Sequence, residues 1–334
     1  MRILFSLIGL MMVFNLKAIE YREVTVSNPA EGSVLAGTLS LPDKKAKAAL
    51  VLATGSGQQD RDETVFGHKP FKTIAEYLSK NGYAVLRLDD RGVGGSTGPL
   101  ENVTTVNFTN DYGRAVDWLD SVLTDVPVGV LGHSEGGQIA YRLAADDPKC
   151  RFIITLAAPA WRGDSLVMAQ CRALSVNALG RWDGEKNQRT ILDIVMSNMP
   201  GESARFAVMS EIAKSLGNAS GMPQMQQFMS TQADLVLSPW YREFIRFDPT
   251  ATIQRVDVPW LALNGDKDTQ VPAENLVTIS QLCPAAATEI MVNHNHLFQH
   301  AITGLPNEYE SIEEDISEET LSLILNWLDR NFSN

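Results

Sequence analysis

Cysteine is scarce in this chain of 334 residues, which contains Cys150, Cys171 and Cys283 and no others. None of the three has the C-x-x-C spacing or the neighbouring group of histidines that a structural zinc site uses. One disulfide could form, and the sequence does not indicate which pair would make it. An odd number leaves at least one thiol free or paired between chains. We therefore expect buried free thiols and no metal site.

Basic side chains are also in the minority, because 28 Lys and Arg residues stand against 40 Asp and Glu residues and the formal net charge is −12. This balance disfavours nucleic acid and anionic membrane surfaces as partners, since both repel a negatively charged protein. Cofactor motifs are missing as well. No lysine follows Gly55-Ser56-Gly57 at the spacing of a phosphate-binding loop, and the glycines after Asp90-Arg91 lack the dinucleotide spacing. We expect no cofactor.

The one long apolar stretch lies at the N-terminus. Residues 3–16 are apolar apart from Ser6 and Asn15, and Ala18 offers a small residue before a cleavage site. This pattern is typical of a secretory signal peptide, which we assign to residues 1–18. The stretch is short for a membrane span, which needs about 20 apolar residues. An uncleaved anchor is the alternative, because Leu16 stands where a small residue is usual. We expect a periplasmic or extracellular protein with no stable membrane partner beyond this export signal.

The remaining chain alternates between strand-like and helix-like segments. Continuous apolar runs, typical of strands buried on both faces, occupy residues 48–53, 83–88, 126–131, 152–157, 258–263 and 288–292. Helical periodicity marks residues 71–78, 112–119, 138–145, 274–282 and 316–328. Residues 21–28 and 34–41 predict an antiparallel hairpin. The succession predicts an α/β fold with a mostly parallel central sheet and helices on both faces.

Residues 160–249 break this pattern. They contain no strand-like run, and they hold seven of the eight methionines that follow residue 18. We interpret this block as a helical lid inserted into a core made of residues 19–159 and 250–334. Because methionine adapts to varied apolar shapes, we expect the lid to shape a substrate pocket. The candidate lining residues are Trp161, Met168, Trp182, Phe228 and Trp240.

A strand-to-helix turn holds the sequence GHSEGG at residues 132–137. It matches the G-x-S-x-G nucleophile elbow, in which small neighbours allow the serine a strained backbone. Ser134 is therefore the candidate nucleophile. We expect the elbow to project the side chain of His133 away from the serine, so His133 is not a candidate base.

An oxyanion hole is the next requirement of such chemistry. The backbone N–H of Glu135, which follows the nucleophile, is one candidate donor. The second should come from the Gly-rich loop after the strand at residues 48–53, where Ser56, Gly57 and Gln58 are the candidates.

The candidate orienting carboxylate follows the strand at residues 258–263, because reactive groups gather at the carboxyl ends of parallel strands. Asp266 and Asp268 both lie in this turn. Asp268 is favoured, because Asp266 directly follows Gly265 and is suited to capping the turn itself.

The candidate base follows the strand at residues 288–292, where the histidines at positions 294, 296 and 300 cluster. A serine hydroxyl needs such a base within hydrogen-bond reach. His296 is favoured, because Leu297 and Phe298 can anchor its loop in the core. The chain order Ser134, Asp268, His296 is the order of α/β-hydrolases.

Together these motifs resemble the α/β-hydrolase superfamily, and more narrowly bacterial serine esterases often labelled dipeptidyl aminopeptidase-like or acylaminoacyl-peptidase-like. The matching pieces are GSGxxDRD at 55–62, DRGxGxS at 90–96, GHSEGG at 132–137, SPW at 238–240 with DP at 248–249, GxxDxxVP at 265–272 and NHLFQ at 295–299. Gln58 stands where proline is usual. The resemblance implies the same choices of Asp268 and His296.

The expected function is that of a secreted serine hydrolase that cleaves carboxylic esters of small to medium acyl chains through a Ser-His-Asp triad and an acyl-enzyme. A peptidase or amidase of the same fold, acting on short peptides or aminoacyl amides, is the alternative. A non-catalytic binding protein on this scaffold is a third hypothesis. The expected partner is a small-molecule ester.

Overall fold

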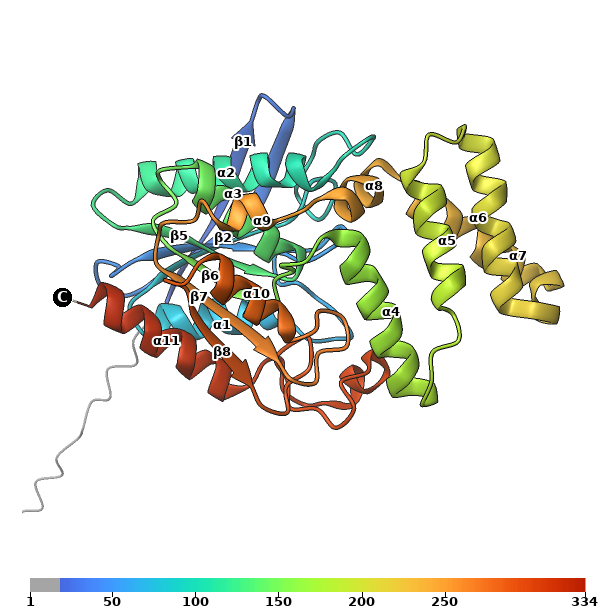
Figure 1. Cartoon of the computed structure of the whole chain (residues 1–334). Coiled ribbons are helices and arrows are strands. Elements are labelled where there is room, and N and C mark those ends of the chain that lie inside the picture. Colours follow the sequence, from blue (N-terminus) through green and yellow to red (C-terminus); the bar gives the residue numbers. More distant parts are fainter. Residues whose placement is uncertain (1–18, 334) are drawn as a thin grey trace, which may run out of the picture.

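Eight strands form one sheet in the computed structural model, which describes residues 19–333 (Figure 1). The predicted signal peptide, residues 1–18, lies outside the described residues. The spatial order of the strands is β1-β2-β4-β3-β5-β6-β7-β8. Their bounds are β1 Glu20–Asn28, β2 Ser33–Leu41, β3 Ala49–Ala53, β4 Ala84–Leu88, β5 Val128–His133, β6 Ile153–Leu156, β7 Trp260–Gly265 and β8 Ala287–Met291.

The sheet is antiparallel at one edge and parallel elsewhere. Strand β1 pairs with β2 and β2 with β4 in the antiparallel sense, whereas every pair from β4 to β8 is parallel. The predicted N-terminal hairpin and the predicted mostly parallel sheet are therefore confirmed. Because the parallel strands share one direction, their carboxyl ends meet at one edge of the sheet, and the loops that follow them lie close together there.

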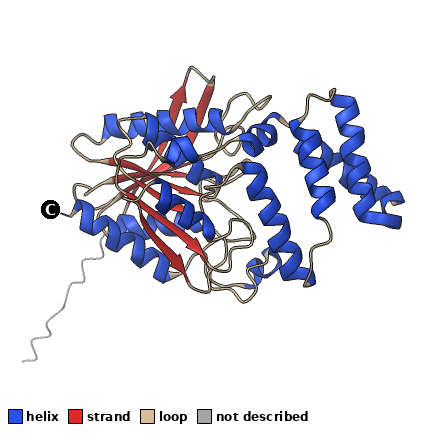
Figure 2. Ribbon diagram, viewed as in Figure 1, coloured by secondary structure: helices blue, strands red, loops and turns tan. Residues whose placement is uncertain are grey.

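Helices cover both faces of this sheet, as the alternation of segments predicts (Figure 2). Side chains on successive strand residues point to opposite faces, so each strand serves two cores. On β3, Leu50 and Leu52 pack in the core under α1 (Pro70–Lys80) and α11 (Glu318–Phe332). Ala49 and Val51 belong to the opposite core. That second core is covered by α2 (Thr105–Val122), α3 (Glu135–Asp146), α9 (Thr250–Ile253) and α10 (Glu274–Leu282).

The segment between β6 and β7 is helical throughout and has no strand in the described chain. Before the short helix α9, its elements are α4 (Gly163–Leu179), α5 (Glu185–Met196), α6 (Gly201–Leu216), the 3₁₀ helix η1 (Gly217–Gly221), α7 (Pro223–Val236) and α8 (Pro239–Arg246). Helices α5, α6 and α7 project beyond the sheet, whereas α4 and α8 lie next to it (Figure 1). Close packing joins α4 to α8, since a Cβ atom at Gly163 would lie 1.9 Å from the Phe244 carbonyl oxygen. A last 3₁₀ helix, η2, spans Pro306–Ser311.

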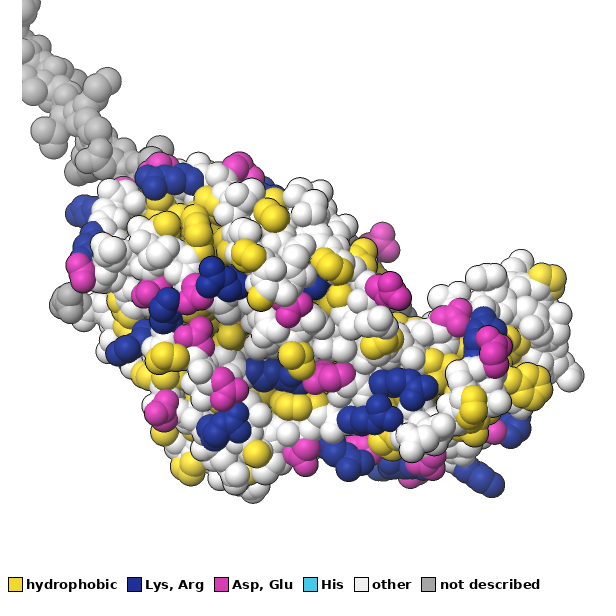
Figure 3. Space-filling model, turned by 90° about the horizontal axis from the view of Figure 1, so that it is seen from above, with side chains coloured by type: hydrophobic (Ala, Val, Ile, Leu, Met, Phe, Trp, Pro, Cys, Tyr) yellow, Lys and Arg dark blue, Asp and Glu magenta, His cyan; other side chains and the backbone are white. Residues whose placement is uncertain are grey.

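The cysteine prediction is confirmed for two residues of three. Cys150 and Cys283 are buried free thiols, and Cys171 on α4 is a free thiol that is only partly buried. Acidic and basic side chains are interspersed on the face seen in Figure 3. Within residues 19–333, no helix combines the length and the apolar character that crossing a bilayer requires.

Candidate active site

The elbow at Ser134 has the strained backbone that its sequence predicts. Ser134 joins β5 to α3 with φ 53° and ψ −119°. A Cβ atom at position 132 would lie 1.9 Å from the Gly136 carbonyl oxygen, and one at position 136 would lie 2.0 Å from the Ala53 carbonyl oxygen. Only glycine fits at either place, because nothing there is a flexible side-chain end. The elbow is therefore locked between β3 and the first turn of α3.

Asp268 and His296, the carboxylate and the base favoured from the sequence, lie within hydrogen-bond distance of each other. His296 Nδ1 lies 2.7 Å from Asp268 Oδ2, and both side chains are buried. The other carboxylate oxygen, Oδ1, accepts hydrogen bonds from the backbone N–H groups of Gln270 and Val271 at 2.8 and 2.9 Å. Together with the Asn264 amide, which donates to Oδ2 at 3.4 Å, these groups fix the carboxylate, and the carboxylate fixes the tautomer and the orientation of the imidazole. The Nε2 atom of His296 is left for the cavity that Ser134 also lines.

The rival residues have other partners. Asp266 is exposed and accepts a hydrogen bond from the Asn293 N–H at 2.6 Å. His294 is buried, its Nδ1 lies 2.8 Å from the Val292 carbonyl oxygen, and burial lowers its pKa. Leu297 and Phe298 are buried next to His296. They anchor its loop in the core, which was the reason for favouring His296 over the neighbouring histidines.

One group of side chains has the composition of a metal site. Ligand atoms of His294, His300 and Glu319 lie within 4.8 Å of one another. Both ring nitrogens of His294 are already engaged, however, since Nε2 lies 2.7 Å from the Ser317 hydroxyl oxygen and Nδ1 faces a backbone carbonyl. His300 is exposed and pairs with Glu314 at 2.8 Å. A metal would have to displace these hydrogen bonds.

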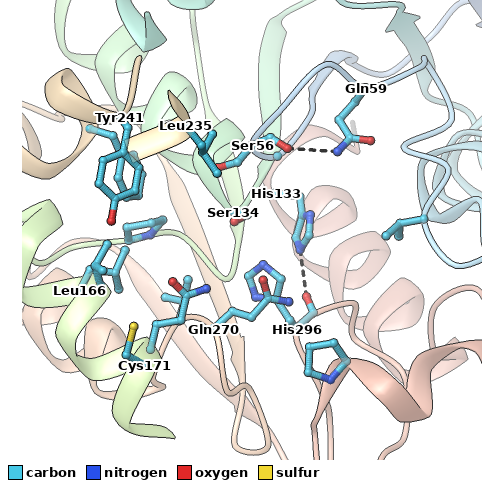
Figure 4. Close-up of a pocket in the computed structure, with 18 of the residues that line it drawn as sticks. Ser56, Gln59, His133, Ser134, Leu166, Cys171, Leu235, Tyr241, Gln270 and His296 are labelled. Atoms are coloured by element: carbon cyan, nitrogen blue, oxygen red, sulfur yellow. Dashed lines mark hydrogen bonds between the residues drawn. The ribbon is translucent and has the colours of Figure 1, made fainter. Parts of the chain in front are cut away.

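Ser134 and His296 open onto a cavity of about 620 Å³ (Figure 4). Core loops form one side of it, and the inserted helices form the other through Leu166 and Cys171 of α4 and Tyr241 of α8. In Figure 4 these side chains face Ser134 across the cavity. The site is therefore assembled from both parts of the chain.

Among the five predicted lining residues, the cavity wall includes Trp240 alone. Trp161 donates its indole N–H to Thr278 on α10 at 2.9 Å, and Met168 is buried in the core. Trp182 packs partly buried against the same core, and Phe228 is 45% exposed on α7. None of these four lines the cavity: Trp161 and Trp182 lie in the loops on either side of α4, and Met168 and Phe228 lie on α4 and α7.

Most of the side chains that the inserted helices contribute to the cavity wall were not predicted from the sequence. Apolar ones are Leu166, Val167, Leu235, Val236, Tyr241 and Phe244, and amide ones are Gln170, Gln188 and Gln232. Helical periodicity marks such positions as partly buried, but it does not distinguish a core neighbour from a cavity.

The candidate oxyanion loop contributes Ser56 to the cavity wall, whereas Gly57 and Gln58 lie outside it. Gly57 has φ 95°, and Gln58 donates its side-chain amide to the Arg91 carbonyl oxygen at 3.1 Å. The loop is thus tied back onto the turn after β4.

The carboxyl of Glu135 has a structural partner on each side of the site. It accepts hydrogen bonds from the Thr105 hydroxyl at 2.6 Å and from the Trp240 indole N–H at 2.8 Å. Burial raises the pKa of Glu135, so this carboxyl is held by its hydrogen bonds rather than by solvent.

Asp90 and Arg91, at the start of the DRGxGxS motif, bind different segments rather than each other. Asp90 is buried and accepts hydrogen bonds from the Thr54 hydroxyl and the Gln59 N–H, both at 3.0 Å. Arg91 pairs with Asp111 at 2.7 Å. Consecutive residues after a strand point to opposite sides, so each one anchors a different segment.

His133 lines the same cavity as Ser134, but both of its ring nitrogens face other acceptors, Glu63 Oε1 and the His296 carbonyl oxygen, each at 2.9 Å. Its ring lies 4.7 Å from the His296 ring, between centroids. The backbone turn at Ser134 leaves the last strand residue facing the loop after β8, a juxtaposition that sequence spacing does not reveal.

Comparisons with known proteins agree with this architecture. A family model described as alpha/beta hydrolase fold matches residues 50–301. Esterase EstD of Thermotoga maritima is 24% identical over 286 residues, which cover 84% of this chain and 60% of that esterase. The chain therefore spans less than two thirds of that relative.

Solved structures match over nearly the whole chain. The alpha/beta hydrolase GrgF from Penicillium sp. sh18 has a TM-score of 0.62 at 15% identity, covering 94% of this chain and 100% of that one. The Pyrococcus furiosus esterase Pf2001 has a TM-score of 0.58 at 16% identity, covering 93% of this chain and 91% of that one. Because the sequence identities are this low, these matches show similarity of fold alone.

Proposed function

This chain belongs to the α/β-hydrolase fold family, and on that basis we propose that it is an exported serine hydrolase that cleaves carboxylic esters of small to medium acyl chains. The observation that carries the proposal is the buried Asp268–His296 pair at 2.7 Å, opening onto the same cavity as Ser134 on its strained elbow. A relative named as an esterase, EstD of Thermotoga maritima, supports it.

In the proposed reaction the Ser134 hydroxyl attacks the ester carbonyl carbon while His296 Nε2 accepts the hydroxyl proton. Asp268 keeps Nδ1 protonated and stabilises the imidazolium that forms. The protonated His296 then gives its proton to the leaving alkoxide, and an acyl-enzyme remains on Ser134. Water, deprotonated by the same imidazole, attacks the acyl carbon, the bond from that carbon to Ser134 Oγ breaks, and His296 returns the proton to Oγ as the acid leaves.

The tetrahedral intermediate carries a negative oxygen that needs fixed donors. We assign one to the backbone N–H of Glu135 at the first turn of α3, where the helix dipole adds to the effect. The second belongs to the loop at Ser56, Gly57 and Gln58, of which Ser56 reaches the cavity. Losing one such donor typically costs about 3 kcal/mol of transition-state stabilisation.

The character of the cavity wall favours an uncharged ester. Among the described residues, the wall contains no Lys or Arg and one carboxylate, Glu63. Apolar side chains such as Leu166, Leu235 and Phe244 suit an acyl chain. The uncharged polar members include five glutamine side chains, Gln59, Gln170, Gln188, Gln232 and Gln270. They suit a neutral, hydrogen-bonding alcohol or acyl group.

The peptidase or amidase alternative comes with the narrower resemblance to the dipeptidyl aminopeptidase-like and acylaminoacyl-peptidase-like group. An aminopeptidase must hold the α-ammonium group of its substrate with a carboxylate. The only carboxylate in the described wall, Glu63, is already hydrogen-bonded to the Gly55 N–H and to His133. This engagement favours esters over free aminoacyl substrates.

Two further parts of the proposal rest on chain organisation. Residues 160–249 act as the lid, because their helices supply one side of the cavity.

The proposal that the protein is exported rests on the N-terminal sequence pattern at residues 1–18. An exported chain should lose about this segment, which the intact mass of the protein purified from the periplasm or medium would report.

The proposal is tested with a panel of p-nitrophenyl esters from acetyl to dodecanoyl, beside aminoacyl p-nitroanilides, on wild type and Ser134→Ala. We expect turnover of short and medium esters that Ser134→Ala abolishes. Absence of Ser134-dependent ester turnover at every chain length would overturn it, and anilide turnover well above ester turnover would move the assignment to an amidase.

A further inference from the structure

A second histidine–carboxylate pair lies behind the proposed triad. Glu63, in the loop after β3, is 3% exposed, and His133, the last residue of β5, is 7% exposed. His133 Nδ1 lies 2.9 Å from Glu63 Oε1, and His133 Nε2 lies 2.9 Å from the backbone carbonyl oxygen of His296. Figure 4 shows this second contact.

Both ring nitrogens of His133 therefore face acceptors. A backbone carbonyl oxygen only accepts, so Nε2 must carry a proton. Glu63 Oε1 already accepts the Gly55 N–H at 2.7 Å, which gives that oxygen the role of a carboxylate acceptor. Nδ1 must then carry a proton as well. A neutral imidazole has one N–H, whereas an imidazolium has two, so the hydrogen-bond count matches the charged form.

We propose that Glu63 holds His133 as a buried imidazolium, and that this pair positions two loops of the active site. Through Nε2–H, His133 fixes the backbone of His296, the proposed base. Through Oε1, Glu63 fixes the amide of Gly55, at the start of the proposed oxyanion loop. Both are positioning residues rather than catalytic ones, and the proposal rests on the esterase function proposed above.

The surroundings strengthen the pair. On the side away from Ser134 it packs against apolar groups of α1 and of the loop after β8, among them Phe71, Ile74 and Leu297. Low polarity there strengthens a hydrogen-bonded ion pair. Burial acts to lower the pKa of His133, but the charge and the hydrogen bond of Glu63, the His296 carbonyl and the charge of Asp268 outweigh it, so this pKa is raised.

The titratable groups that act on His133 are Glu63, His296 and Asp268. Loss of the second N–H would leave the His296 carbonyl or Glu63 without its donor. The kcat/KM of the wild type should therefore fall on the alkaline side with a pKa above about 6.5, the usual value for histidine.

Two variants separate charge from shape. Glu63→Gln keeps an acceptor oxygen for Gly55 and places its amide nitrogen where the unpartnered, buried Glu63 Oε2 now lies, so it removes mainly the negative charge. We expect the alkaline limb to move to lower pH. His133→Gln cannot donate in two opposite directions and does not titrate, so we expect the alkaline limb to vanish and kcat to fall by up to about 100-fold.

His68→Gln is the matched control. His68 is also a buried histidine between a carboxylate and a carbonyl, with Nδ1 3.3 Å from Asp315 and Nε2 2.9 Å from the Tyr309 carbonyl oxygen. It is not part of the cavity wall. The alkaline limb should persist in this variant. A limb that persists unchanged in His133→Gln, or that is absent in the wild type, would overturn the proposal.

A measurement independent of turnover keeps the pair testable if the esterase proposal fails or if a variant does not fold. Nitrogen-15 NMR of the protein labelled at its five histidines should show, near neutral pH, a ring protonated at both nitrogens that is still present in His68→Gln. That signal should disappear in His133→Gln and remain in Ser134→Ala. A singly protonated His133 ring at neutral pH would contradict the proposal whatever the enzyme's substrate.

Discussion

Trp240 donates its indole N–H to the carboxyl of Glu135 at 2.8 Å, and so ties the inserted helix α8 to the residue that directly follows Ser134. Trp240 also belongs to the cavity wall. One hydrogen bond thereby couples the position of the inserted helices to the elbow. Thr105 of α2 shares the same Glu135 oxygen, Oε1, which completes a link across three elements.

Trp240→Phe tests this link. The ring volume is largely kept, but the buried Glu135 carboxyl loses a donor, which typically costs about 1–3 kcal/mol. We expect a lower Tm and a raised KM for the longer acyl esters, with kcat for acetyl esters little changed. Trp182→Phe is the control, because Trp182 lies outside the cavity wall. Equal effects of the two substitutions on KM would rule out the link.

Asp268→Asn should lower kcat by about 10⁴-fold, because an amide donor in place of the carboxylate favours the wrong imidazole tautomer. Asp266→Asn should leave kcat near the wild-type value, since Asp266 is exposed and bonds only the Asn293 N–H in its turn. Steady-state kinetics on one p-nitrophenyl ester distinguish the two. A larger loss in Asp266→Asn would reverse the assignment.

Gly136→Ala should abolish activity and lower stability, although a glycine-to-alanine change inside a helix usually raises stability. Its Cβ atom would lie 2.0 Å from the Ala53 carbonyl oxygen, so the elbow would have to move. Gly201→Ala at the start of α6 meets nothing within 4 Å, and we expect it to be neutral or stabilising. Thermal denaturation and ester turnover of both variants check the contrast.

Asp90 predicts a pH dependence of stability. Burial raises the pKa of Asp90 to about 7 in the folded protein, whereas an unfolded aspartate titrates near about 3.9. Between these values the folded state binds the proton more tightly, so the contribution of Asp90 to the free energy of unfolding is full at low pH and falls as pH rises to about 7.

Asp90→Asn should remove this contribution and flatten the dependence of Tm on pH between about pH 4 and about pH 7. Tm measured across that range reports it. The exposed Asp43→Asn serves as the control, and its profile should follow the wild type. A slope in Asp90→Asn as steep as in the wild type would show that other groups produce it.

Patterns that are local in sequence predicted most of the fold. Continuous apolar runs marked the buried strands, and the change to helical spacing marked the helices between them. Ser134 was identifiable because the close approaches at Gly132 and Gly136 demand glycine. Asp268 and His296 were found because each follows a strand whose end reaches the same edge of the sheet.

The contacts that the sequence did not reveal join distant segments. Glu63 and His133 are 70 residues apart, and His133 and His296 are 163 apart, so neither pair leaves a spacing pattern. The lining of the cavity was missed for a different reason. Met168 and Leu166 lie two residues apart on α4, yet Leu166 reaches the cavity wall and Met168 does not. Helical periodicity predicts that a side chain is buried, but it does not predict whether that side chain faces the packed core or the cavity.

The central claim is that Ser134 is a nucleophile activated by His296. Incubating the folded protein with a fluorophosphonate and mapping the adduct by peptide mass spectrometry tests it directly. We predict one adduct, on Ser134, that forms far more slowly in His296→Ala and is absent in Ser134→Ala. No adduct on the folded wild type, or an adduct on another residue that persists in Ser134→Ala, would contradict the claim.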